Sequence, residues 1–442
     1  MSLTPPESVW KLQTALHAKA KAAPGYRFYA LYDKLYRRDV LHHAYRCWRA
    51  NRGSPGVDEQ SFEDIESSGL EDWLDALTQD LSNKNYRPDP VKRVWIPKPD
   101  GKERPLGIPT IRDRVVQMAA VLVMQPIFET DLPEEQFGYR PGKSALQAVE
   151  AVQQHLDAGY TEVVDADLSG YFDSIPHAEL MKSVARRISD RHLLHLVKMW
   201  LEAPVEGTDE HGRKQRTTRN KDEGRGTPQG GVISPLLANL YMRRFIAGWK
   251  RSEHEQRLAA HIVNYADDFV ICCKPGKADE VMAVMRRMMG ELRLRVNEKK
   301  TRRCTLPGET FDFLGYTFGR CYSIKTGRAY LSPSPKKSKV QQMSREVSAL
   351  TDRRWYWKDV SQIVASLNAR LSGWANYFCL GPVRKARRTV DKHVRKRMRQ
   401  WLCEKHRVRG RGYTRYPDEY LHGELGLIQL EGQPHRLLWA KG

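Results

Sequence analysis

The sequence lacks paired cysteines. Its seven cysteines are scattered over 442 residues, and none has a C-x-x-C partner. This pattern argues against a zinc site and against a disulfide framework, and it fits a reducing compartment. No window approaches the roughly 18 apolar residues of a membrane span, and the N-terminal residues have no apolar segment of the signal-peptide type. We therefore expect a cytoplasmic protein, associated with nucleoid or RNA, that does not use a membrane as partner.

Acidic residues are also few. The chain has 53 Asp and Glu residues against 74 Lys and Arg residues, which gives a formal net charge of +21. Such an excess predicts a polyanionic partner, with nucleic acid as the first candidate, although a basic solvated surface is the plainer alternative. The spacing G-x-x-x-x-G-K-[ST] is absent, which argues against a P-loop NTPase.

The length and the apolar content of 40% predict two or more packed units. Strand-like runs at 91–99, 162–168 and 311–318 alternate with helical sequence, and from about residue 333 the pattern is helical only. We therefore expect an α+β fold followed by a helical region. A strongly basic helix is predicted after Pro382, with a thin apolar stripe formed by Val383, Val390, Val394, Met398, Trp401 and Leu402.

Two adjacent aspartates interrupt an apolar run in NYADDFVICC. Asp267 and Asp268 lie between two strand-like segments, which predicts a hairpin with both carboxylates at its tip. Neighbouring carboxylates repel each other, and a bound divalent cation reverses that repulsion. Oxygen ligands suit Mg²⁺. The stretch DADLSGYFD offers further carboxylates, and Asp165 and Asp167 share one face of their strand.

Any one of these aspartates alone is more simply a turn or capping residue. Residues that can handle phosphate strengthen the metal-site interpretation. Lys98 and Arg104 flank a glycine turn, and residues 224–237 form a glycine-rich loop that a substrate could approach closely.

Several segments resemble, in order, the successive blocks of group II intron-encoded reverse transcriptases. The helical segment LNARLSGWANYF is similar to the maturase-specific, thumb-region motif of that family, and the match runs from about residue 30 to about residue 415. The blocks are IPKPDGKERPLGIPTIRDR, FGYRPGKSA, DADLSGYFDSIPH, GTPQGGVISPLLANLY, YADDFVI, VNEKKT and FDFLGYTF.

The resemblance implies a right-hand polymerase with fingers and palm, followed by an all-helical thumb. The expected divisions are an N-terminal helical extension with the start of the fingers at 1–85, fingers and palm at 86–320, the thumb and maturase-specific domain at 321–382, and a basic region binding DNA or RNA at 383–442. The tail after Tyr413 has no cysteine and two histidines, so the endonuclease module that family members often carry is not expected.

The resemblance also assigns roles to individual residues. Asp167, Asp267 and Asp268 match the catalytic aspartates that bind two Mg²⁺ ions, for which Mn²⁺ is a possible substitute, and the carbonyl of Leu168 is an expected extra ligand. Phe172 matches the aromatic gate that excludes a 2′-hydroxyl group. The nucleotide-binding set is Lys98, Arg104, Phe172, Gln229 and Lys300, of which Lys300 matches a lysine near the leaving pyrophosphate.

Nucleic-acid contacts are expected at two places. Arg140 and Lys143 could contact the template, although a basic turn is equally consistent. The basic helix at 383–411 is the expected site for intron RNA or target DNA, with contacts at Arg387, Arg388, Arg395, Arg397 and Arg399.

The resulting hypothesis is an RNA-directed DNA polymerase that also binds its group II intron RNA and assists splicing and mobility. Its expected partners are that intron RNA, an RNA template, a DNA primer or target, and deoxynucleoside triphosphates. Two alternatives remain: a domesticated stand-alone reverse transcriptase acting in DNA repair or phage defence, and a splicing-only maturase with a vestigial polymerase.

Overall fold

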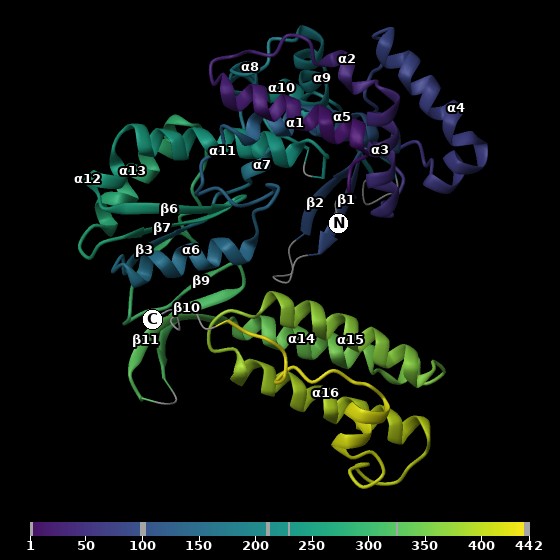
Figure 1. The fold of residues 1–442 in the computed structure, drawn as a ribbon, viewed down its shortest axis with the longest axis vertical. Helices are drawn as coiled ribbons and strands as arrows, with labels where there is room; N and C mark the ends of the chain where they lie inside the picture. Colours follow the sequence, from purple (N-terminus) through teal and green to yellow (C-terminus); the bar gives the residue numbers. More distant parts are fainter. Residues whose placement is uncertain (1–2, 98–102, 209–212, 229, 324–325, 437–442) are drawn as a thin grey trace.

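The computed structural model describes residues 3–97, 103–208, 213–228, 230–323 and 326–436. In these described ranges, helices and three sheets make up the N-terminal three quarters of the chain, and the long helices α14 (Lys337–Leu350), α15 (Val360–Tyr377) and α16 (Arg384–Lys405) form a group below them (Figure 1). None of the described helices is long and apolar enough to cross a bilayer.

The N-terminal helices pack around one central apolar helix, α5 (Ile111–Glu129), which is buried along most of its length. In α4 (Phe62–Ser82) the apolar residues Leu74, Leu77 and Leu81 recur at helical spacing and are buried. Ser61 begins that helix with a capping box to Asp64. The helices before α5 are α1 (Glu7–Ala22), α2 (Tyr32–Leu35), α3 (Arg38–Ala50) and α4 (Phe62–Ser82).

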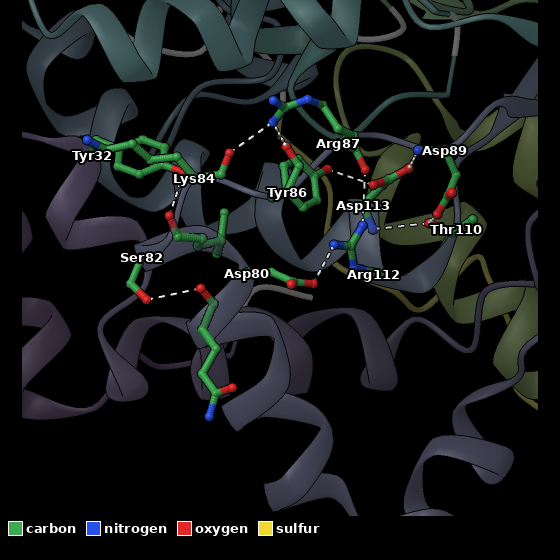
Figure 2. A network of polar contacts seen from close by, with 12 residues as sticks. Tyr32, Asp80, Ser82, Lys84, Tyr86, Arg87, Asp89, Thr110, Arg112 and Asp113 are labelled. Atoms are coloured by element: carbon green, nitrogen blue, oxygen red, sulfur yellow. Dashed lines mark hydrogen bonds and ion pairs between the residues drawn. The ribbon is translucent and has the colours of Figure 1, made fainter.

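A buried carboxylate joins these helices to the strands that follow. Asp113 of α5 accepts hydrogen bonds from the Tyr86 hydroxyl at 2.6 Å and from the Asp89 amide at 2.9 Å (Figure 2). The Trp200 indole in turn donates to the Tyr86 oxygen at 3.1 Å. Burial raises the pKa of Asp113 to about 6. The network fixes the segment that leads into the first sheet.

That first sheet has the strand order β2-β1-β4-β5. The strand expected at 91–99 is confirmed as far as Pro97, after which the described residues resume at Glu103. The strands are β1 (Val91–Pro97), β2 (Glu103–Ile108), β4 (Val205–Thr208) and β5 (Lys214–Thr217).

The second sheet, of order β6-β7-β3-β8, separates two hydrophobic cores. Successive residues point to opposite faces, so Val164 packs with helices α11 (Ser234–Arg251) and α13 (Ala278–Glu291), whereas Val163 packs with α6 (Ala145–Asp157). Its strands are β3 (Glu162–Ala166), β6 (Ala260–Tyr265), β7 (Asp268–Cys273) and β8 (Arg302–Thr305). The shorter helices around it are α7 (Tyr171–Ser174), α8 (His177–Ala185), α9 (Arg191–Leu201), α10 (Arg219–Glu223) and α12 (His254–Arg257).

The aromatic stretch FDFLGYTF is not the single strand that the sequence predicts. It forms two antiparallel strands, with Phe313 paired to Tyr316 across a two-residue turn. Both turn residues, Leu314 and Gly315, have positive φ, as a type I′ hairpin requires. Because aromatic residues flank this turn on both sides, the sequence pattern predicts one continuous strand instead of a hairpin. The strands are β9 (Phe311–Phe313), β10 (Tyr316–Tyr322) and β11 (Ala329–Pro335), so the helical region begins only after Pro335.

The three long helices α14 (Lys337–Leu350), α15 (Val360–Tyr377) and α16 (Arg384–Lys405) share one core with the C-terminal segment. The apolar stripe predicted for the basic helix is confirmed, because all six of its residues are buried. The division expected at 382/383 therefore runs through a continuous core, since α16 packs against α14 and α15. The described C-terminal segment includes one turn of π-helix, η2 (Tyr420–Glu424).

Two arginines of α16 are structural, and their expected nucleic-acid contacts are wrong. Arg387 is 1% exposed and donates to the carbonyls of Gln433 at 2.5 Å and Pro434 at 2.9 Å. Arg399 is buried and bonds the Tyr416 carbonyl and the Asp418 carboxylate. Counting arginines along the helix could not separate the buried face from the exposed one.

The other three arginines differ among themselves. Arg395 and Arg397 are half-buried and turn toward Asp418 and Thr351. The Arg388 side chain is 74% exposed and pairs with Glu431 at 2.8 Å. Of the five predicted contacts on α16, only Arg388 is open to a polyanion without rearrangement.

We expect the substitution Arg387→Ala to destabilise the helical domain by about 2–4 kcal/mol, because it leaves a cavity and several buried carbonyls without donors. Arg388→Ala changes the next residue, which lies on the exposed face of α16, and should change stability by no more than about 0.5 kcal/mol. Thermal unfolding and limited proteolysis measure both. Equal effects of the two substitutions would contradict the burial of Arg387.

Candidate active site

The strand register brings the predicted aspartates to one place. In the antiparallel pair of β3 and β7, Ala166 lies opposite Phe269, so Asp167 follows opposite Asp268 at the end of the ladder. Paired residues point to the same face, and Asp165 shares that face because it is two positions before Asp167. Asp267 lies in the two-residue turn between β6 and β7. The predicted hairpin with carboxylates at its tip is confirmed.

This turn is held by groups that sequence reasoning missed. The Asn264 side chain donates to the carbonyls of Ala266 at 2.8 Å and Asp268 at 3.3 Å. Ala266 adopts a positive φ of 60°, which is strained for a residue with a Cβ atom. Asn264 is fully buried in an apolar strand, and a polar residue in such a position is the signal that could have identified it.

The block FGYRPG supports the turn from behind. Phe137 donates its amide hydrogen to the Asn264 carbonyl at 2.8 Å. A Cβ atom added at Gly138 would collide with the backbone nitrogen of Ala266, so only glycine allows these two backbone segments to approach this closely.

Asp167 is positioned by the block VNEKKT. The Asn297 side chain donates to one carboxylate oxygen of Asp167 at 2.9 Å, and the Asn297 amide donates to the Asp167 carbonyl at 2.8 Å. Lys300 places its Nζ atom 3.4 Å from the other carboxylate oxygen. The structure therefore brings Lys300 to the aspartates, whereas Asn297 was not predicted.

Asp165, Asp167 and Asp268 line a hollow of about 160 Å³, to which β9 contributes Asp312, whereas Asp267 lies in the adjoining turn and is not among the lining residues. Burial, followed by the charges of Asp267, Asp167 and Asp165, raises the pKa of Asp268 to about 6, although part of this residue faces solvent. Burial also raises the pKa of Asp165, an effect that Arg302 at 3.5 Å opposes. The hollow thus concentrates negative charge that the protein itself neutralises only in part.

Within the described residues, no three His, Cys, Asp or Glu side chains are arranged to hold a metal ion as they stand. The donor set nevertheless fits a hard divalent cation, because it offers only oxygen ligands and because their mutual repulsion falls when a cation binds. Asp167, Asp267 and Asp268 would hold it, once Lys300 releases Asp167.

The expected nucleotide-binding residues have mixed outcomes. Phe172 of α7 is 6% exposed, and its carbonyl accepts a hydrogen bond from the Thr227 amide at 2.7 Å, which places the glycine-rich loop beside the aspartates. Its gate role stays a prediction. Lys98, Gln229 and the side chain of Arg104 lie outside the described residues.

The glycine-rich loop also contacts the first sheet. A Cβ atom added at Gly230 would collide with the carbonyl oxygen of Gly107 in β2. This close approach holds β2 against the glycine-rich loop.

The template contact expected for Arg140 is wrong. Its side chain is 3% exposed and bonds the Glu129 carboxylate and the carbonyls of Pro133 and Gln136. Lys143 pairs with Glu134 at 2.5 Å, and its template contact stays a prediction.

Comparison with known families decides the class of the protein. The family described as reverse transcriptase (RNA-dependent DNA polymerase) matches residues 96–318, which contain every aspartate of the hollow. The chain belongs to the reverse transcriptases. A second family, the maturase-specific domain of group II introns, matches residues 340–416 of this reverse transcriptase. The expected α+β reverse transcriptase fold is confirmed, and the enzyme is an RNA-directed DNA polymerase.

Individual relatives agree with this assignment. Protein YkfC of Escherichia coli K12 is 33% identical in an alignment of 379 residues that covers 77% of this chain and 96% of that protein. The group II intron-encoded protein LtrA of Lactococcus lactis is 32% identical in an alignment of 218 residues that covers 49% of this chain and 34% of LtrA. Nuclear intron maturase 2 of Arabidopsis thaliana is 30% identical in an alignment of 160 residues that covers 29% of this chain and 22% of that protein.

The raised pKa of Asp268 gives a test of the electrostatics of the hollow. A carboxyl group whose pKa rises on folding contributes stability that is fully present below its ordinary pKa and is lost as the pH rises through about 6. Asp268→Asn should therefore raise Tm at pH 8 without divalent cations by roughly 2 °C, a modest effect because the group is partly solvated. The gain should shrink toward pH 4.

Scanning calorimetry in the presence of a chelator measures this difference. Asp75→Asn, at an exposed position of α4, is the matched control and should show no such pH dependence. A Tm difference for Asp268→Asn that is the same at pH 4 and pH 8 would contradict the like-charge cluster.

Proposed function

We propose that this reverse transcriptase copies RNA into DNA at the hollow between β3, the β6–β7 turn and β9, and that its helical domain binds a group II intron RNA and assists splicing and mobility. The observation that carries the proposal is the convergence of Asp167 and Asp268 at the end of one strand ladder, with Asp267 in the adjoining turn and Lys300 in contact. Both family matches lie on the same chain.

In the proposed reaction, Asp167, Asp267 and Asp268 hold divalent cations with help from the carbonyl of Leu168. Two Mg²⁺ ions, or Mn²⁺ in their place, would activate the primer 3′-hydroxyl group and stabilise the pyrophosphate as it departs. Leu168 lies between two backbone hydrogen bonds: the Asp167 carbonyl accepts from Asn297, and the Ser169 amide donates to Arg295. These bonds fix the Leu168 backbone beside the carboxylates.

Lys300 has two roles in this scheme. In the structure it partly neutralises Asp167, and its side chain is 65% exposed, so it can swing away when a cation arrives. Once released from Asp167, its ammonium group can stabilise the negative charge that develops on the leaving pyrophosphate. Lys98, Arg104 and Gln229 complete the proposed nucleotide site, where the triphosphate carries the negative charge.

Phe172 is proposed to select deoxynucleotides. The residue is 6% exposed, and its carbonyl accepts a hydrogen bond from the Thr227 amide, which fixes its backbone beside the glycine-rich loop. A close-packed aromatic ring has little room to move, so it would act as a steric gate against a sugar that lies on it.

For intron RNA, the proposed contact surface is the exposed face of α16. Lys385, Arg388, Lys392 and Lys396 follow one another at helical spacing on the side opposite the buried stripe, and all four are exposed. This face replaces the buried Arg387 and Arg399 as the candidate. Phosphate contacts from such a row give affinity without reading sequence.

Primer extension on an RNA template, compared with splicing of a group II intron RNA, tests the catalytic part. We expect Asp267→Ala to abolish extension, because the cations lose a ligand, while RNA-assisted splicing remains. Asp75→Ala, a surface aspartate, should leave both activities intact. Loss of splicing together with extension in a variant of unchanged Tm would show that the aspartates do not act in polymerisation alone.

The basic face of α16 has its own test. Replacing Lys385, Lys392 and Lys396 together by glutamine should weaken binding of structured RNA and reduce the salt dependence of log K by about 0.7–0.9 for each lost phosphate contact. The matched control replaces Lys277, Arg286 and Arg287 by glutamine; the two arginines are exposed on α13, and Lys277, the residue before that helix, is half-buried. Binding isotherms at several salt concentrations measure the slopes, and an equal loss in the control would mean that only net charge matters.

A further inference from the structure

The connection between α14 and α15 exposes a large aromatic side chain. It has the sequence TDRRWYWKD at residues 351–359 and includes the short 3₁₀ helix η1 (Arg353–Trp355). Trp357 is 74% exposed, so its indole adds little to the core of the helical domain. An indole left in water at this extent has a cost that binding of a partner would remove.

This connection, here called the tryptophan tip (351–359), has a fixed shape. Lys405, the last residue of α16, donates to the carbonyls of Tyr356 at 2.7 Å and Lys358 at 2.9 Å. The Tyr356 ring packs edge-on against Trp401, with ring centroids 6.0 Å apart. These anchors hold the backbone on both sides of Trp357, so the exposed indole is presented in advance of any partner.

Trp355 and Lys358 complete the surface around the indole. The Trp355 indole donates to the Ala349 carbonyl at 3.1 Å, which fixes that ring beside Trp357 at a centroid distance of 6.3 Å. The Lys358 ammonium lies 4.1 Å from the Trp355 ring centroid and 5.6 Å from that of Trp357. A cation therefore accompanies both rings.

The surroundings of the tip are basic. Arg353 and Arg354 are exposed within it, and Arg354 also bonds Asp352. The segment after α16 follows directly from Lys405, and Figure 1 shows it at the same end of the helical domain. That segment adds a further exposed row, Arg407, Arg409 and Arg411. This charge favours a polyanion over a protein surface as the partner.

The tip lies away from the aspartates. Gly315, beside the hollow, approaches the side chains of Lys339 near the start of α14 and Phe378 at the end of α15. The tip is at the opposite ends of both helices, so the 14 residues of α14 alone separate it from that contact by about 20 Å. A nucleic acid on the tip is therefore bound outside the hollow.

We propose that the tryptophan tip is a stacking site for an unpaired nucleobase, with Trp357 under the base and with Arg353, Arg354 and Lys358 on the flanking phosphates. A base within a duplex is already stacked on its neighbours, whereas an unpaired base offers a free face to the indole. The ligand class is single-stranded nucleic acid, as a loop, bulge or end of an RNA or as a displaced DNA strand. The inference does not depend on the polymerase site.

Binding by the full-length protein tests the proposal. Trp357→Ala should weaken binding of a short single-stranded RNA about fivefold or more, because stacking of one base is lost, while Trp357→Phe should retain most of the affinity. The matched control is Tyr322→Ala, which removes another exposed aromatic ring, 62% exposed on β10, and should leave the affinity unchanged. Thermal unfolding confirms that each variant is folded.

A second readout locates the base. Single-stranded RNA carrying 5-iodouridine should crosslink on irradiation to the peptide that contains Trp357, and the crosslink should be lost in Trp357→Ala. Parallel arms use single-stranded DNA of the same sequence and a blunt RNA duplex. If the affinities for single-stranded RNA and DNA both depend on Trp357, the site accepts an unpaired base of either nucleic acid. If only the affinity for RNA depends on Trp357, the site is specific for RNA. Unchanged affinity of Trp357→Ala, the same loss on the duplex, or crosslinks confined to other peptides would overturn the proposal.

Discussion

Repulsion among carboxylates at the end of β3 is the constraint on which this molecule depends. The register of β3 and β7 places Asp167 opposite Asp268, with Asp267 in the adjoining turn, and burial, followed by the charges of these neighbours, raises the pKa of Asp268. Such a cluster costs stability unless an opposite charge compensates it, and the divalent cation proposed above would turn this repulsion into binding energy.

The surrounding blocks act mainly by holding that cluster in place. Asn264 fixes the turn, Gly138 lets its own segment of the chain lie directly behind that turn, and Asn297 orients Asp167. The contacts of Gly138 and Asn297 join segments far apart in the sequence, whereas Asn264 acts within its own hairpin, and each uses a small or amide side chain that composition alone would assign to a loop. Rigid support of this kind keeps like charges together without a bound ion.

In the helical domain, some basic side chains are buried in the core and others are exposed to solvent. On α16, Arg387 and Arg399 bond buried carbonyls and Asp418, whereas Lys385, Lys392 and Lys396 face solvent. The same helix therefore both completes the core and offers a row of cations to RNA. The tryptophan tip, the proposed stacking site, adds exposed aromatic surface with cations of its own at the end of this domain that is remote from the hollow.

The sequence by itself determined the chemistry of this protein. The ordered motifs identified the family, strand periodicity placed Asp165 and Asp167 on one face, and the two-residue interruption at Asp267 predicted the hairpin, because these are local patterns with fixed periods. Only the tertiary structure decided which cations are available. Arg140 and Arg387 were predicted as nucleic-acid contacts but are buried, the FDFLGYTF strand folds back at Leu314 and Gly315, and α16, beyond the division expected at 382/383, shares one core with α14 and α15. Burial depends on what packs against a side chain from elsewhere in the chain, and no local pattern contains that information.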